Sequence, residues 1–563
     1  MKRPGLLRYW PLLLVTIVSF AIKMYDPLRS PVLAALDPWG WTVQARQFLA
    51  THELNLFFTQ TGYPPTFLYF VAGLAEVFHA DPYDVVRFLP IIAALNVIPI
   101  YLLALEIFHS HRISALGSLL AVTSRFYFVR TSIGIPEGLA QLFFTFVIFF
   151  LLKSLSTPSW RNRLLGATSV AVSVLYYHFT LIILIPFLLI LPLGLWSRKR
   201  IVVREIGFTA LPAFIVAGLV WYLQVLPNML QYYLGTKAAT YARPTFERSV
   251  GGLFRLMVYS VAKSSVVAFA EMGYVITLLA LVGIAYLVRD RFRENEGFGP
   301  RLLLTYLAVL VGLTLMLRFV YDLGLASAGD SSVYMFSWLA IPAAIFSASA
   351  VMFGINQIGE NLHYKFPAKN FTRAIKVAAI CAIILLVLVN LNALDYYKAP
   401  SGGGLIPDSF YYYRPMTNQE YYALAYIRDN TPTDAQILVV GVEHIILEEQ
   451  AVVARRAVIG ITNMTIVNQT IEFSGQIFFP DAHYENITCG KIQENGPSSE
   501  EVYVVTGIRY VSIDIARIQG SPPATVVLNE QLLTGQLAGS TAYHMFYQND
   551  QITVDEVPLQ IQY

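Results

Sequence analysis

Long apolar segments separated by short polar loops recur from the N-terminus to about Ala393, and after this residue the pattern becomes that of a soluble chain. A run of about 20 apolar residues can cross the hydrocarbon core of a bilayer as a helix. The spacing predicts about 11 such helices. They are expected near residues 9–24, 85–107, 113–128, 138–152, 164–177, 180–196, 206–226, 264–288, 302–317, 333–353 and 375–392. We therefore expect a polytopic α-helical membrane protein.

One further apolar run does not fit this series. The segment from Phe67 to Phe78 is short for a bilayer and follows the sequence Gly62-Tyr63-Pro64-Pro65. It is therefore expected to lie as a helix at the outer interface of the membrane. This interpretation makes the first outer loop long, from residue 25 to residue 84.

The charges of the loops predict the orientation of the chain. Basic residues gather in the loops after every second span, for example Arg161 and Arg163 after the fourth, and Lys2, Arg3 and Arg8 precede the first span. Short basic loops favour the cytoplasmic side of a membrane. The pattern predicts a multi-pass protein of the cell membrane with a cytoplasmic N-terminus and an extracytoplasmic C-terminal part.

Composition agrees with this class and excludes another. Hydrophobic residues make up 56% of the chain, charged residues make up 13%, and the mean hydropathy is +0.55, values far from those of a soluble domain. The net charge of +3 is too small to indicate a nucleic-acid partner, and the basic residues do not alternate with aromatic residues in a stacking pattern. The bilayer is the expected partner.

The C-terminal part is expected to form a small mixed α/β domain. A glycine-rich linker at residues 400–404 precedes a helical pattern at 417–429, and the strand-like runs lie at 437–440 and 502–513. This predicts a transmembrane domain at 1–393 and an extracytoplasmic domain at 394–563. The second domain shows no catalytic constellation, so its expected role is to recognise an acceptor or to cover a site.

Asp37 is the first candidate for chemistry. It stands in Leu36-Asp37-Pro38-Trp39-Gly40-Trp41, in a polar loop beyond the first predicted span. A carboxylate at the mouth of an apolar bundle is costly to leave unsolvated, so it usually faces water, a cation or a substrate. We expect Asp37 to act as a base or to orient an acceptor.

The second predicted outer loop, residues 129–137, carries Arg130 and Glu137. Pro136 suits the first turn of the next helix, and Glu137 stands where the helix dipole favours an anion. Two roles for Glu137 stay open at this point. It either stabilises the start of that helix, or it binds sugar hydroxyls, holds a divalent cation or shares the role of base.

Several cationic residues on the outer side could bind a phosphate group, and Arg130 of the second loop is one of them. Arg46 would orient Asp37, contact phosphate or serve as an interfacial arginine. His178 stands in a tight turn, where it could touch the phosphate or satisfy a carbonyl group. Arg243 and Lys263 belong to a basic outer loop that could equally contact lipid headgroups, and Arg318 could grip the phosphate or pair with Asp322.

Together these motifs resemble a known family. Asp37-Pro38-Trp39, Ala45-Arg46 and Gly62-Tyr63-Pro64-Pro65 look like the first outer loop of the oligosaccharyltransferase catalytic subunits and their polyprenyl-dependent relatives. The run from Arg130 to Glu137 resembles their second acidic motif, and is similar to the proline-glutamate version in dolichyl-phosphate-mannose-type transferases. The resemblance implies the C-type glycosyltransferase fold and covers residues 1–200 best.

The resemblance also implies an activity. It implies an inverting transfer of a sugar from a polyprenyl-phosphate-linked donor to an unknown acceptor on the outer face, with Asp37 and Glu137 in catalysis and as ligands of a divalent cation, magnesium or manganese. The sequence departs from the family at two points. Ile135 replaces a second acid, and the tryptophan-rich motif that binds acceptor sequons is absent, since no tryptophan follows Trp338.

Two other classes of function stay open. The chain could be a transporter or lipid-binding scaffold, although the acids gather at one face and not at the midplane. It could also be a noncatalytic relative that anchors a surface domain. The sequons at Asn463, Asn468 and Asn486, with only two cysteines in the chain, are compatible with an archaeal surface protein.

Overall fold

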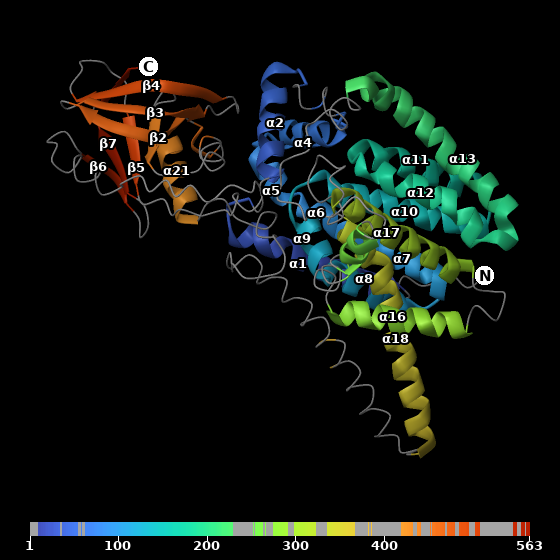
Figure 1. The fold of residues 1–563 in the computed structure, drawn as a ribbon. Coiled ribbons are helices and arrows are strands. Elements are labelled where there is room, and N and C mark those ends of the chain that lie inside the picture. The colour runs from blue at the N-terminus through green and yellow to red at the C-terminus, as the bar shows by residue number, and fades with distance from the viewer. Residues whose placement is uncertain are drawn as a thin grey trace. The chain divides into compact units, whose positions relative to one another are not determined.

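The computed structural model in Figure 1 places most of the chain up to residue 365 and the strands of the C-terminal part. The structure describes residues 9–33, 37–54, 58, 62–228, 252, 254–262, 265, 274–290, 298–322, 335–365, 381, 384, 418–431, 436–440, 451, 453–455, 457–467, 470–478, 484–494, 502–506, 544–548, 553–557 and 559–562. The domain boundary predicted at 393/394 lies outside these residues.

The chain forms two compact units, which are described separately below. The first, here called the helical unit, comprises Met1–Asp26, Leu54–Tyr69 and Phe88–Ile406. The second, here called the mixed unit, comprises Pro27–Glu53, Phe70–Arg87 and Pro407–Tyr563. The mixed unit thus combines much of the predicted first outer loop, including Asp37, with the C-terminal part of the chain.

Helices account for nearly all of the described helical unit. They are α1 (Trp10–Arg29), α6 (Pro90–Ala93), η2 (Ala94–Asn96), α7 (Val97–Phe108), α8 (His111–Thr123), α9 (Arg125–Ser132), α10 (Pro136–Ser156), α11 (Trp160–Tyr176), α12 (Phe179–Gly194), η3 (Trp196–Arg198), α13 (Lys199–Ala217), η4 (Gly218–Tyr222), α16 (Tyr274–Asp290), α17 (Phe298–Asp322) and α18 (Met335–Lys365). The apolar run expected at the interface forms α4 (Thr66–Phe78), which begins in the helical unit and belongs to the mixed unit from Phe70 onward.

Several of these helices are long and apolar enough to cross a membrane. Among the described residues there are 5, namely Pro82–Phe108, Pro136–Ser156, Lys199–Asn228, Gly299–Val320 and Met335–Gln357. Shorter apolar helices lie at Trp10–Tyr25, Thr66–Phe78, Phe179–Gly194 and Tyr274–Arg289. The chain is therefore a multi-pass membrane protein. The total of about 11 spans stays a prediction, because most of the span expected at 375–392 lies outside the described residues.

Aromatic side chains fill the centre of the helical unit. The ring of Phe144 in α10 meets Trp338 in α18 edge-on, with ring centroids 5.0 Å apart, and lies 5.7 Å from Tyr306 in α17. Phe187 of α12 contacts the same tyrosine. Aromatic pairs in this geometry contribute beyond the area that they bury. Four helices from distant parts of the chain therefore meet around one cluster.

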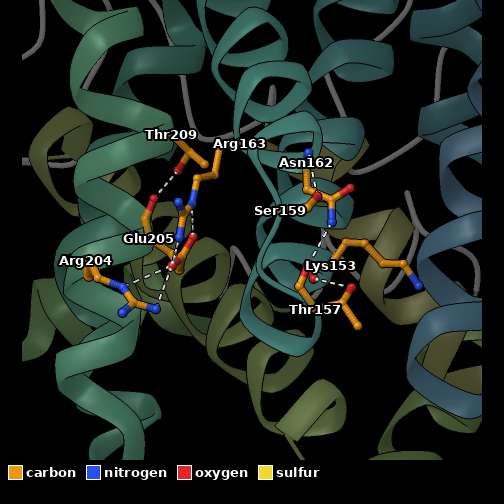
Figure 2. A network of polar contacts seen from close by, with 8 residues as sticks. All are labelled: Lys153, Thr157, Ser159, Asn162, Arg163, Arg204, Glu205 and Thr209. Carbon is orange, nitrogen blue, oxygen red and sulfur yellow. Dashed lines mark hydrogen bonds and ion pairs between the residues drawn. The ribbon is translucent and has the colours of Figure 1, made fainter.

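A second set of contacts is polar and joins α10, α11 and α13 (Figure 2). The side chain of Glu205 in α13 is completely buried, and Arg163 in α11 donates to both of its carboxylate oxygens at 2.8 Å. Arg204 approaches the same carboxylate at 3.1 Å. The turn between α10 and α11 is fixed as well, since the side-chain amide of Asn162 donates from Nδ2 to Thr157 O at 3.1 Å. These contacts hold two helices that begin in loops predicted to be cytoplasmic.

We expect Glu205→Gln to destabilise the protein by about 1.5–3 kcal/mol, because it removes from a buried position the charged acceptor of three hydrogen bonds, two from Arg163 and one from Arg204. The matched control is Glu106→Gln. Glu106 pairs with Lys153 at 2.8 Å, but the lysine side chain is 36% exposed. Loss of this ion pair should therefore cost less than about 1 kcal/mol. Thermal unfolding in detergent measures both variants. Equal melting temperatures for Glu205→Gln and Glu106→Gln would contradict the larger contribution to stability that we assign to Glu205.

The described part of the mixed unit contains α2 (Asp37–Thr51), α5 (Pro82–Phe88) and α21 (Asn418–Asn430) with an 8-stranded sheet. The strands are β1 (Gln436–Val440), β2 (Ala457–Val467), β3 (Thr470–Phe478), β4 (Tyr484–Glu494), β5 (Val502–Thr506), β6 (His544–Gln548), β7 (Thr553–Val557) and β8 (Leu559–Gln562). The sheet appears in orange to red in Figure 1.

The order of the strands is β6-β7-β5-β1-β2-β3-β4-β8, with β1 at the centre. β1 pairs in parallel with β2 and β5, and the other pairs are antiparallel. The helix expected at 417–429 coincides with α21, and the strand expected at 437–440 coincides with β1. The strand expected at 502–513 is described only for Val502–Thr506.

Candidate functional site

The two acids expected to act together fall in different units, so each is described with its own surroundings. Asp37 is the first residue of α2 and is exposed. The sequence was interpreted as a polar loop here, and that interpretation is wrong. An acid followed by proline suits a helix start, because the dipole favours the anion and proline supplies no amide to the helix. The helix therefore presents Asp37 at its end, while Trp39 and Val43 are buried.

Arg46 lies near the other end of α2, nine residues after Asp37, or about 13 Å further along the helix axis. It binds Asp81, with Arg46 Nη2 2.9 Å and Nε 3.2 Å from Asp81 Oδ1. Arg455 donates to the other carboxylate oxygen, Oδ2, and the backbone amide of Tyr83 donates to Oδ1 at 2.8 Å. Asp81 was not among the predicted site residues. It is the point at which three segments of the mixed unit meet.

These partners determine the charge of Asp81. Burial by itself raises the pKa of this carboxyl group, but Arg46, the amide of Tyr83 and Arg455 together outweigh it and hold the pKa below its ordinary value. A lowered pKa in the folded state stabilises the protein above the unfolded pKa of about 4. This contribution is lost as the pH falls through the lower pKa of the folded state.

We therefore expect the melting temperature of Asp81→Asn to lie below that of the wild type at pH 6, and the difference to shrink as the pH falls below about 4. Thermal unfolding in detergent between pH 3 and pH 7 measures it, with Glu76→Gln, an exposed acid in α4, as the control. If the difference in melting temperature between the wild type and Asp81→Asn grew as the pH fell, the lowered pKa assigned to Asp81 would be contradicted.

Glu137 lies in the helical unit and is completely buried. It follows Pro136, with which α10 begins as predicted. Arg130 binds Glu137 Oε2 through Nη2 at 2.5 Å and through Nε at 2.7 Å. On the other oxygen, Oε1, Ser337 Oγ donates at 2.5 Å and Gln141 Nε2 at 3.1 Å. The carboxylate thus joins α9, α10 and α18. These contacts favour a structural role for Glu137.

The second outer loop is shorter than the sequence predicted. The prediction of a loop at 129–137 is wrong for its first half, because α9 continues to Ser132 and only residues 133–135 separate it from α10. The break in the preceding apolar run occurs earlier, at Ser124, whose backbone is extended. Arg130 therefore projects from a helix, and it is buried with 2% exposure.

Lys23 in α1 is a buried lysine that the sequence analysis missed. Its Nζ donates to Phe128 O at 2.7 Å, to Thr131 Oγ1 at 2.5 Å and to Ser132 Oγ at 2.9 Å. All three acceptors belong to the last part of α9. A lysine inside the first apolar span was the available signal, because a charge at that position requires internal partners. Lys23 fixes the end of the helix that carries Arg130.

His178 lies in the turn between α11 and α12, as predicted. Its ring packs edge-on against Tyr63 with centroids 4.7 Å apart, which brings the Gly62-Tyr63-Pro64-Pro65 motif to this turn. Trp221 Nε1 donates to Gly62 O at 3.1 Å and holds the motif from the other side. Burial lowers the pKa of His178 to about 4. The imidazole is therefore neutral at pH 7, and it would meet a phosphate as a hydrogen-bond donor without a positive charge.

The remaining phosphate candidates divide into two groups. Arg318 is buried in α17 and forms an ion pair with Asp322 one turn later, with Nη2 and Oδ1 2.7 Å apart, while Ser260 donates to the same acid at 2.7 Å. Pairing was one of the two roles predicted for Arg318. Arg243 and Lys263 lie outside the described residues.

The chemistry of the donors around Glu137 bears on the predicted divalent cation. A guanidinium group and two neutral donors surround this carboxylate. Such partners neutralise a carboxylate, whereas a magnesium or manganese site needs several oxygen ligands that converge on the ion. Among the described residues, no group of three or more histidines, cysteines and acids could hold a metal ion. We therefore assign no step to a metal, and the predicted cation at Asp37 and Glu137 stays a prediction.

Comparison with known proteins shows that part of the chain is similar to a family. The family model of the dolichyl-phosphate-mannose-protein mannosyltransferases matches residues 63–222. This segment is mannosyltransferase-like. It contains Arg130, Glu137 and His178, and it begins after Asp37. The match confirms the resemblance that the sequence predicted. No curated protein matches the chain.

Several solved structures are similar to the chain at low sequence identity. One is the archaeal oligosaccharyltransferase AglB from Archaeoglobus fulgidus, in complex with an inhibitory peptide and a dolichol-phosphate, with a TM-score of 0.48 and 15% identity over 80% of this chain. The chain covers 64% of that protein, less than two thirds of its length. Another is ArnT from Cupriavidus metallidurans, with a TM-score of 0.46 and 12% identity over 97% of both chains.

Proposed function

We propose that the chain is a membrane glycosyltransferase that moves a sugar from a polyprenyl-phosphate-linked donor to an acceptor on the outer face of the membrane, with inversion at the anomeric carbon. The observation that carries this proposal is the mannosyltransferase-like segment at residues 63–222. The exposed carboxylate of Asp37 at the start of α2, outside that segment, adds a group that can accept a proton.

In the proposed reaction, Asp37 accepts the proton of the acceptor hydroxyl as the oxygen attacks the anomeric carbon. The bond from that carbon to the phosphate oxygen breaks, and the lipid phosphate leaves with the electron pair. Positive groups or hydrogen-bond donors stabilise the departing phosphate. Of the predicted candidates, His178 could donate a hydrogen bond from its turn, and Arg243 and Lys263 could supply charge.

The contacts of Glu137 and Arg130 support a different role for these two residues. A buried ion pair that joins three helices holds the segment between α9 and α10 in one arrangement. We propose that this pair positions the outer ends of both helices without touching the substrate. We further propose the orientation that the basic loops predict, with a cytoplasmic N-terminus, about 11 spans and residues 394–563 on the outer side as a mixed α/β domain.

The test is transfer of a labelled sugar from a short-chain polyprenyl-phosphate donor by the purified protein in lipid nanodiscs. We expect a glycosylated product whose anomeric configuration, measured by NMR, is opposite to that of the donor. Retained configuration would overturn the inverting step. Flux of a substrate in liposomes without sugar transfer would instead support a transporter. A parallel assay with a metal chelator decides whether a divalent cation is required.

A further inference from the structure

Two sets of contacts connect α2 to the C-terminal part of the mixed unit, and the first is aromatic. Trp39, two residues after Asp37, packs against Tyr83 with ring centroids 5.4 Å apart. Tyr83 also stacks on Tyr421 of α21, with centroids 5.9 Å apart and an angle of 23° between the rings. The hydroxyl of Tyr83 donates to Pro31 O at 2.6 Å, which fixes the middle ring.

The second set is ionic. Asp81 stands just before α5 and accepts from Arg46 of α2 through Oδ1 and from Arg455 of the C-terminal part through Oδ2. The Asp81 side chain is 16% exposed, whereas that of Arg455 is 50% exposed. The carboxylate therefore links two arginines that are 409 positions apart in the chain, 46 and 455.

The spacing of the two contact points gives them a common effect. Trp39 and Arg46 are seven residues apart, so they lie on the same face of α2 about two turns from each other. Both rest on the short segment Asp81–Tyr83, and each reaches residues 407–563 through it. A helix held at two points along one face cannot tilt or rotate freely. The first of these points is next to Asp37.

We propose that Tyr421 and Arg455 are positioning residues that orient α2, and with it the carboxylate of Asp37, for the transfer reaction. This inference rests on the proposed function. Neither residue touches the reacting atoms. The C-terminal part of the chain would complete the active site by fixing the direction of the helix that carries the base, because small displacements of a catalytic group reduce the rate strongly.

The experiment uses the full-length protein in nanodiscs and measures sugar transfer and hydrogen exchange for the same variants. We expect Arg455→Gln and Tyr421→Ala to lower kcat by about 5- to 100-fold, with KM for the lipid-linked donor within about twofold of wild type. Arg455→Lys should restore part of the loss, and Tyr421→Phe, which keeps the ring and loses only the contact of the hydroxyl with Arg428, should be much closer to the wild type than Tyr421→Ala. The exposed acid variant Glu76→Gln is the control.

A double-mutant cycle tests whether Arg455 acts through Asp81. If it does, Arg455→Gln combined with Asp81→Asn should be no slower than the more severe single variant, because both changes remove the same contact. If the fold-losses in kcat of the two single variants multiplied in the double variant, Arg455 would not act through Asp81. Unchanged kcat in Arg455→Gln and Tyr421→Ala, with lower melting temperatures alone, would show that the contacts are only structural and would overturn the proposal.

Hydrogen exchange separates this inference from the proposed function. The amides of residues 39–51 should exchange faster in Arg455→Gln and Tyr421→Ala than in the wild type, whether or not the protein transfers a sugar. If the wild type transfers no sugar, the proposed function fails, and faster exchange still supports the orientation of α2 by these residues. Unchanged exchange in both variants would overturn it.

Discussion

Asp37→Asn should lower kcat for sugar transfer by about 10²- to 10⁴-fold, the contribution that a positioned general base usually makes. KM for the lipid-linked donor should change little, because the variant keeps the shape of the side chain and removes only its ability to accept a proton. The melting temperature should also change little. Asp37 is exposed, and loss of the favourable interaction between its charge and the helix dipole costs about 0.3–1 kcal/mol.

The matched control is Asp84→Asn. Asp84 is also exposed, and it stands in the first turn of α5 in the same unit. Transfer of labelled sugar from a short-chain lipid donor measures both variants, and thermal unfolding in detergent shows whether each is folded. Activity of Asp37→Asn within threefold of the wild type would overturn the assignment of Asp37 as the base.

Arg130→Met should lower the free energy of unfolding by about 3–5 kcal/mol, because it leaves the carboxylate of Glu137 buried without its ionic partner. Glu137→Gln should have an effect of similar size, since it leaves the guanidinium group unpaired. The double variant should be more stable than either single variant, because no buried charge remains. Chemical or thermal unfolding in detergent measures the series.

A surface pair supplies the control for this series. Arg428 and Asp429 are 2.7 Å apart, but their side chains are 30% and 59% exposed, so Arg428→Gln should cost less than about 1 kcal/mol. The loss in the free energy of unfolding of the Arg130 and Glu137 double variant could instead equal the sum of the losses in the two single variants. That result would contradict the assignment of the two residues as one buried ion pair. Sugar transfer by a folded double variant would show that Glu137 takes no direct part in the chemistry.

Local signals in the sequence were enough to predict several of these features. Pro136 marks the start of α10, and the four-residue spacing of Arg318 and Asp322 allows the pair that forms. The sequence Asp37-Pro38 is also a signal for a helix start, and it was interpreted as a loop because it lies just beyond the first predicted span. Helix starts depend on one or two residues, so they are visible without knowledge of the fold.

Contacts between distant segments could not be predicted in this way. Ser337 binds Glu137 from 200 positions away, and Arg455 reaches Asp81 from 374 positions away. Nothing in the spacing of either pair distinguishes it from many others of the same chemistry. The predicted roles of Arg46 and Arg130 in binding phosphate were based on charge alone, and charge does not reveal which carboxylate folding will bring within reach.

The buried amine of Lys23 has a consequence for the biosynthesis of the protein. Lys23 stands two residues from the end of the apolar stretch Trp10–Tyr25, so it disfavours insertion into the bilayer by less than the about 2.5–3.5 kcal/mol of a charge at the helix centre. Its acceptors on α9 begin 105 residues later, and a ribosome needs roughly 5–20 s to reach them. During that interval the first helix should stay beside the insertion machinery, and an early chain truncated before α9 should be recovered there by crosslinking.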